Sequence, residues 1–239
     1  MMEHTIKAFD ADLQDLGRMI AEMGGLAESQ LAAAIDAVVK RDSELAAIVV
    51  EGDAKVDQLQ RDLDNLAIRL LAMRQPMARD LREIFAALKI GSDLERMCDY
   101  AANVAKRSIA LNQTPPVRPV YALPRMAHLA QLLVKDVIDA YVARDADKAY
   151  SVWTRDAELD EMYSSLFREL LTYMMEDPRN IGACTHLLFM AKNIERIGDH
   201  ATNIAENLYY LVNGRPLEEA RPKGDSSNIE LVQPNRPAT

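Results

Sequence analysis

Residue types that would point to a sheet-rich or disulfide-bonded protein are scarce in this chain of 239 residues. Only 5% of the residues are aromatic and nine are glycine, whereas Ala, Leu, Asp, Glu, Arg and Met dominate. Such a composition favours helices over strands, and a hydrophobic fraction of 49% is enough to build a core. The composition therefore predicts an all-α fold.

Long apolar runs and paired cysteines are also absent from the sequence. No run approaches the roughly 18 apolar residues that a membrane span needs, and the first residues lack the charged-then-apolar layout of a signal peptide. Cys98 and Cys184 have no CxxC spacing, so we expect them to be reduced core residues. These features lead us to expect a cytoplasmic protein.

The charge balance is acidic, with a net charge of −9. Nucleic-acid binding depends on clustered Lys and Arg, and no such basic stripe is present. Cations or basic protein surfaces are therefore the better candidate partners.

What the chain does contain is an internal repeat at an offset of 100 residues, between the stretches 89–106 and 190–206. The matching residues are Glu95 and Glu195, Arg96 and Arg196, Asp99 and Asp199, Ala101 and Ala201, Asn103 and Asn203, and Ala105 and Ala205. Self-similarity of this kind indicates two copies of one structural unit.

Each half contains three stretches whose apolar residues recur at steps of three and four, the pattern of an amphipathic helix. The expected helices span residues 6–40, 44–73 and 77–111 in the first half, and 123–144, 146–175 and 178–212 in the second. Gly24 and Gly25 interrupt the first stretch without ending it, either by kinking the helix or by allowing close packing. Short turns between the helices predict antiparallel neighbours.

The two halves are separated by a segment, 113–119, that holds three prolines. We predict a first bundle over 1–112, a linker over 113–120 and a second bundle over 121–213. Residues 214–239 contain almost no apolar side chains, so we expect a disordered tail there. The predicted architecture is two tandem, pseudo-repeated antiparallel three-helix bundles.

Acidic residues interrupt the apolar stripe of the third helix in each half. Positions seven apart fall close to one line on a helix, and Glu95 and Glu195 lie at the middle of two such lines that we expect to face the core. Further oxygen donors follow on the flank of each line. They are Asp99 and Asn103 in the first half, and Asp199 and Asn203 in the second.

The second helix of each half adds two carboxylates four residues apart, Asp53 with Asp57 and Asp156 with Asp160. Antiparallel packing brings them near the acids of the third helix. Crowded carboxylates repel one another, so some are protonated or a cation compensates them. The donor set lacks a thiolate and a Glu-x-x-His motif, and favours iron, manganese, magnesium, calcium or zinc. An ordinary solvated helix face remains the alternative.

The opposite faces of these helices are rich in polar side chains, and we expect them to face solvent. Their residues are Arg82, Lys89, Asp93, Arg96, Tyr100 and Arg107 in the third helix, and Asn193, Arg196, His200 and Asn207 in the sixth.

The duplicated motif resembles the signature of the PhoU family of phosphate-uptake regulators. The resemblance rests on Leu94-Glu-Arg-Met-Cys-Asp-Tyr-Ala-Ala-Asn-Val-Ala105 and Ile194-Glu-Arg-Ile-Gly-Asp-His-Ala-Thr-Asn-Ile-Ala205. Asp80-Leu-Arg82, Glu51-Gly-Asp53 and Asp57 extend it, so that it covers roughly residues 5–213.

This resemblance implies two three-helix bundles, multinuclear iron or zinc clusters and a homodimer. It also implies a cytoplasmic, non-enzymatic negative regulator of phosphate uptake and of the phosphate-starvation regulon. Such a protein links the ATPase subunit of the phosphate ABC transporter to a phosphate-sensing histidine kinase, and touches membrane complexes only peripherally. The metal candidates carried over by position are Glu95, Asp99, Asn103, Glu195, Asp199 and Asn203, with support from Asp53, Asp57, Asp156, Asp160 and Glu206.

The two copies differ at one position that bears on metal binding. Glu206 has Lys106 as its counterpart, so the first site has one acid fewer and one cation more. We therefore expect the second site to bind metal more strongly.

Two other function classes remain open. The first is a carboxylate-bridged metal enzyme in a helical bundle, against which stands the absence of the Glu-x-x-His motif that such sites typically use. A metal-free helical scaffold would use the acidic faces to hold basic partners.

Overall fold

The computed structural model describes residues 2–74, 77–117 and 121–218, and every regular element within them is a helix. The elements are α1 (Met2–Lys40), α2 (Ser43–Arg74), α3 (Ala78–Leu111), α4 (Leu123–Ala143), α5 (Ala146–Thr154), α6 (Asp156–Glu176), the short 3-10 helix η2 (Pro178–Asn180) and α7 (Ile181–Asn213). The all-α prediction is confirmed. Residues 118–120 of the predicted linker and 219–239 of the predicted tail lie outside the described residues. None of the described helices is apolar over enough of its length to cross a membrane.

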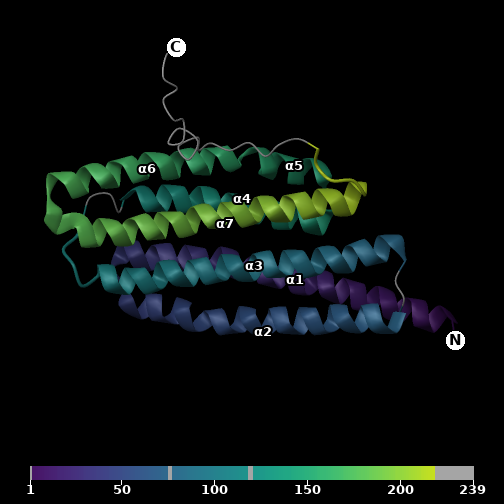
Figure 1. Cartoon of the computed structure of the whole chain (residues 1–239). Helices are drawn as coiled ribbons and strands as arrows, with labels where there is room; N and C mark the ends of the chain where they lie inside the picture. The colour runs from purple at the N-terminus through teal and green to yellow at the C-terminus, as the bar shows by residue number, and fades with distance from the viewer. Residues whose placement is uncertain (1, 75–76, 118–120, 219–239) are drawn as a thin grey trace, which may run out of the picture.

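The long helices run roughly along one direction, with α1 to α3 on one side of the molecule and α4 to α7 on the other (Figure 1). Helices α1, α2 and α3 pack on one another and form the first bundle, and α4 to α7 form the second. In both bundles the first helix is followed by the same kind of turn, in which one arginine, Arg41 or Arg144, takes the left-handed backbone conformation. In the first turn the Asp42 carboxylate then caps α2, accepting hydrogen bonds from the backbone N–H of Glu44 at 3.0 Å and of Leu45 at 2.9 Å. The repeated sequence thus folds as two tandem bundles.

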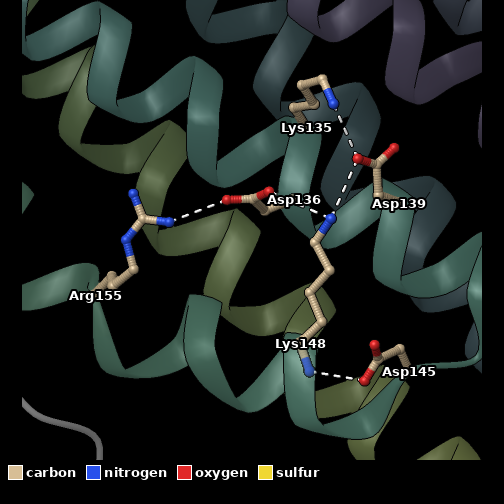
Figure 2. Close-up of polar contacts among 6 residues, drawn as sticks. All are labelled: Lys135, Asp136, Asp139, Asp145, Lys148 and Arg155. Atoms are coloured by element: carbon tan, nitrogen blue, oxygen red, sulfur yellow. Dashed lines mark hydrogen bonds and ion pairs between the residues drawn. The ribbon is translucent and has the colours of Figure 1, made fainter.

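The fifth predicted helix is two helices, because the chain breaks between α5 and α6 at Arg155. Neither proline nor glycine lies there, so the sequence carries no ordinary signal for a break. Acidic side chains of α4 pair with basic residues at the break and in α5 (Figure 2). Arg155 Nη1 lies 3.0 Å from Asp136 Oδ2, and Lys148 Nζ contacts Asp136 at 3.3 Å and Asp139 at 3.2 Å. Arg155, at the break, is thus paired with a residue of another helix.

The two bundles share one continuous hydrophobic core, in which α3 of the first packs along α7 of the second. The prediction that their polar faces meet solvent is wrong for much of this surface. Asp93 Oδ1 lies 2.7 Å from His200 Nδ1, the rings of Tyr100 and His200 are 5.6 Å apart, and the Arg107 guanidinium lies over Phe189. Polar groups are tolerated at this interface because they pair across it.

Close packing also explains Gly24 in the middle of α1. A Cβ atom at Gly24 would lie 2.6 Å from Ile138 Cγ1 of α4, closer than real Cβ contacts allow. Helix α1 runs through this point without a break. Of the two readings open for this glycine, close helix packing is correct.

Candidate functional site

The predicted core lines of α3 and α7 lie along the edge of the core. On these lines Ala102 and Thr202, seven residues after the glutamates, are buried, whereas Leu81 and Ile181, fourteen residues before them, are about half exposed, at 47% and 48%. Glu95 and Glu195 are accordingly half-buried. This position holds the acids against α2 and α6 and also leaves them open to solvent on one side.

In the first bundle four carboxylates from α2 and α3 meet, and we call them the first acidic cluster: Asp53, Asp57, Glu95 and Asp99. Burial, together with Asp99 and Asp57, raises the pKa of Asp53 to about 6 from its ordinary 3.8, and Lys106 opposes the shift. Burial and the other three acids also raise the pKa of Glu95. The four carboxylates are therefore close enough for their charges to interact, as the predicted antiparallel packing allows.

The first acidic cluster contains a buried carboxylate oxygen without a hydrogen-bond partner. Asp53 Oδ1 is buried and has no hydrogen-bond partner, while the Asp53 side chain also engages Asp99 in a hydrogen bond that favours the protonated form. A buried acceptor without a donor costs free energy on the order of 1–3 kcal/mol. Such a cluster favours either a shared proton or a bound cation.

The counterpart in the second bundle is the second acidic cluster: Asp156, Asp160, Glu195 and Asp199. Asp156 and Asp160 of α6 are buried, at 1% and 8% exposure. Burial raises the pKa of Glu195, and Asp199 and Asp160 add to that effect. Helix α6 approaches α7 closely at Gly198, where a Cβ atom would lie 2.3 Å from Leu159 Cδ2 and 3.6 Å from Asp156 Oδ1.

A lysine that sequence reasoning did not single out already neutralises part of the second acidic cluster. Lys192 Nζ lies 2.6 Å from both carboxylate oxygens of Glu195 and opposes the upward shift of the Glu195 pKa. The signal was present, because Lys192 precedes Glu195 by three residues, a spacing at which oppositely charged side chains meet on a helix.

Glu206, which we expected to strengthen the second site, is bound elsewhere. Its Oε1 accepts a hydrogen bond of 2.9 Å from the indole Nε1 of Trp153, a buried residue of α5. Two reasons ranked the second site above the first: the extra acid Glu206 and the extra cation Lys106 in the first bundle. The structure offsets both, because Glu206 binds Trp153 and because Lys192 gives the second cluster a lysine of its own. The ranking itself stays a prediction.

Asn203 is also drawn away from its cluster. Its side-chain amide lies 3.4 Å from Asp93 Oδ1 of α3, beside the contact between Asp93 and His200. Asn103 is half-buried at the equivalent position of α3. The structure thus brings together the carboxylates of each predicted set and places Asn203 at the interface between the bundles.

The two clusters supply carboxylate oxygens as ligands and no thiolate. Cys98, next to the first acidic cluster, is buried, and burial with the neighbouring carboxylates raises the pKa of its thiol, which keeps it protonated. Within the described residues no three His, Cys, Asp or Glu side chains are arranged closely enough to hold a metal ion as they stand. Binding a cation therefore requires the side chains to converge further.

Comparison with known proteins places this arrangement in a family. The family model described as PhoU domain matches residues 20–108 and, a second time, residues 123–208. The chain belongs to the PhoU family. Each matched PhoU domain contains one of the two acidic clusters, and the family predicted from the duplicated motif is confirmed.

Similar proteins match this PhoU chain over nearly its whole length. A phosphate-specific transport system accessory protein PhoU homolog from Caulobacter vibrioides is 51% identical over 226 residues, which cover 94% of this chain and 98% of the relative. A homolog of the same description from Rhizobium meliloti is 50% identical over 94% of this chain and 95% of the relative.

Two solved structures have the same fold. The crystal structure of PhoU from Pseudomonas aeruginosa superposes with a TM-score of 0.84 at 41% identity, and covers 87% of this chain and 100% of the other. The phosphate transport system regulatory protein PhoU from Streptococcus pneumoniae gives a TM-score of 0.82 at 29% identity, with 88% and 100% covered. The predicted pair of tandem bundles is therefore the PhoU fold.

Proposed function

We propose that this protein is a negative regulator of phosphate uptake and of the phosphate-starvation regulon. The observation that carries the proposal is the 51% identity, over 94% of this chain and 98% of the relative, to a protein described as a phosphate-specific transport system accessory protein. The protein would act in the cytoplasm as a homodimeric adaptor between the ATPase subunit of the phosphate ABC transporter and a phosphate-sensing histidine kinase. Its helical surfaces would serve binding, and it would catalyse no reaction.

The regulator proposal is tested by deleting the gene and measuring a phosphate-starvation promoter fused to a reporter. In phosphate-rich medium we expect high reporter expression in the deletion strain, and repression on complementation with the wild-type gene. Unchanged expression in the deletion strain would refute the proposal. Co-purification with the tagged transporter ATPase and with the kinase tests the adaptor role separately.

We propose further that the first acidic cluster binds a metal ion, iron or zinc being the first candidates and manganese, magnesium or calcium the others. The support is chemical. Asp53, Asp57, Glu95 and Asp99 are hard oxygen donors. Burial and the neighbouring carboxylates raise the pKa of Asp53 and of Glu95, and one buried oxygen of Asp53 has no partner. A bound cation would compensate this crowded negative charge and fix α2 against α3.

Elemental analysis of the purified protein tests the metal proposal. We expect metal in the wild type and a loss in Asp53→Asn/Asp99→Asn, whereas Asp62→Asn, an exposed carboxylate on α2, serves as the matched control and keeps the metal. Equal metal content in all three proteins would refute the site. Oxidase or phosphatase turnover that disappears in Glu195→Ala would instead favour the competing reading as a metal enzyme.

A further inference from the structure

A basic pocket lies between the two bundles, away from the acidic clusters. The cavity has a volume of about 340 Å³ and is lined by Arg79, Arg82, Glu83, Arg144, Leu211 and Val212. These residues come from the start of α3, the turn between α4 and α5, and the end of α7. Sixteen residues of helix, about 24 Å, separate Arg79 from Glu95, so this pocket is a separate site.

The pocket carries an excess of positive charge with unused donors. Three guanidinium groups face one lining carboxylate, Glu83, which forms an ion pair with Arg144. Arg82 Nε and Arg144 Nη1 are buried and have no hydrogen-bond partner. Buried donors on charged groups are costly unless an acceptor meets them. The pocket therefore lacks an acceptor that carries negative charge.

The internal repeat shows that Arg144 has different partners from its counterpart in the first bundle. Arg41 occupies the turn equivalent to that of Arg144, and its Nη2 donates to the carbonyl oxygens of Asn112 at 2.8 Å and Thr114 at 2.6 Å, which fixes the end of α3. Arg144 instead contacts Glu83 and the ring of Tyr141. At the repeat offset of 100, Arg82 and Glu83 correspond to Gly182 and Ala183. The pocket is thus a departure from the repeat.

We propose that this pocket binds a small tetrahedral dianion of the phosphate class. Guanidinium groups present parallel N–H donors that match the oxygens of such an anion. Once Glu83 has neutralised Arg144, the Arg79 and Arg82 charges remain, and two positive charges match a dianion better than a carboxylate. The bound anion would join α3 of one bundle to the α4–α5 turn of the other.

Isothermal titration of the full-length protein with inorganic phosphate tests the pocket, in the presence of a chelator that removes metal-bound phosphate as a source of heat. We expect saturable binding by the wild type. Arg82→Gln and Arg79→Gln each weaken it by about tenfold or more, because each removes a charge-assisted hydrogen-bond donor. Arg79 is exposed, so its substitution leaves the fold intact even if Arg82→Gln does not.

Two further variants distinguish the pocket from general attraction between charges. Glu83→Gln removes the one lining carboxylate, and we expect tighter phosphate binding. Arg61→Gln, an exposed arginine on α2, is the matched control and leaves the affinity unchanged.

Sulfate competing with phosphate supports the proposal. Absence of saturable phosphate binding, acetate competing equally well at matched ionic strength, or the same loss in Arg61→Gln as in Arg79→Gln would each overturn it. None of these results depends on the regulator proposal, which the reporter strain tests.

Discussion

At the scale of single residues, Asp53 makes the stability of the fold depend on pH, because its pKa is about 6 in the folded chain and 3.8 in an ordinary environment. The folded state therefore binds more protons between these values. The resulting stabilisation is fully present below pH 3.8 and is lost as the pH rises through 6. The carboxyl group is only partly buried and solvent screens its interactions, so we discount the shift to about 1 kcal/mol.

We therefore expect the chelator-treated protein to lose about 1 kcal/mol of unfolding free energy between pH 4.5 and pH 7 through this group. Urea denaturation at a series of pH values measures it. Asp53→Asn cannot titrate and should flatten the dependence, while Asp62→Asn on the same helix keeps it. A profile for Asp53→Asn that follows the wild type would show that the acids of this cluster do not interact.

Lys192 gives a second prediction at this scale, since it competes with any cation for Glu195. Replacing it with methionine keeps much of the aliphatic stem and removes the charge. If the second acidic cluster binds metal, Lys192→Met should raise metal affinity there by about tenfold, as measured by metal titration of the chelator-treated protein. Lys135→Met, which removes an exposed lysine of α4 paired with Asp139, should change nothing. Equal affinities in both variants would exclude Lys192 as the competitor.

At the scale of elements, the sequence predicts the helices whose bounds follow from the apolar spacing, and it misses the features that involve contacts between helices. The apolar spacing predicts α1, α2, α3, α4 and α7 closely, and the fixed offset places the carboxylates of each cluster in register. At the break, Arg155 is paired with Asp136 of another helix. The interface around His200 and Asp93 is polar, and a helical pattern alone does not distinguish such an interface from a solvated face.

Gly198 tests how closely α6 and α7 must approach to form the second acidic cluster. In Gly198→Ala the new methyl group meets Leu159 Cδ2 at 2.3 Å, so we expect a loss of about 1–3 kcal/mol in unfolding free energy. Gly182→Ala in the same helix has open space around the new methyl group and should gain up to about 1 kcal/mol from helix propensity. Denaturant unfolding followed by circular dichroism measures both. A neutral Gly198→Ala would mean that the Leu159 side chain or α6 as a whole can move away from α7 at no cost.

At the scale of the whole molecule, the two halves share a core, so we expect them to unfold as one unit despite their repeated sequences. The buried residues of both bundles form a single cluster, and α1 packs on α4 as α3 packs on α7. Trp153, the one tryptophan of the chain, is buried in the second bundle and reports on that half alone. Tryptophan fluorescence and far-ultraviolet circular dichroism should therefore give coincident urea transitions in the wild type.

Gly24 is the residue through which this coupling can be weakened. The methyl group of Gly24→Ala meets Ile138 of the other bundle, so we expect it to cost about 1–3 kcal/mol and to push the bundles apart. Its neighbour Gly25 has no atom within 4 Å of an added Cβ, and Gly25→Ala should stabilise the helix by about 0.5–1 kcal/mol. We expect the two transitions to separate in Gly24→Ala, with the fluorescence transition displaced from that of circular dichroism, and to coincide in Gly25→Ala. Coincident transitions and unchanged stability in both variants would show that the contact between α1 and α4 does not hold the bundles together, and would leave that role to α3 and α7.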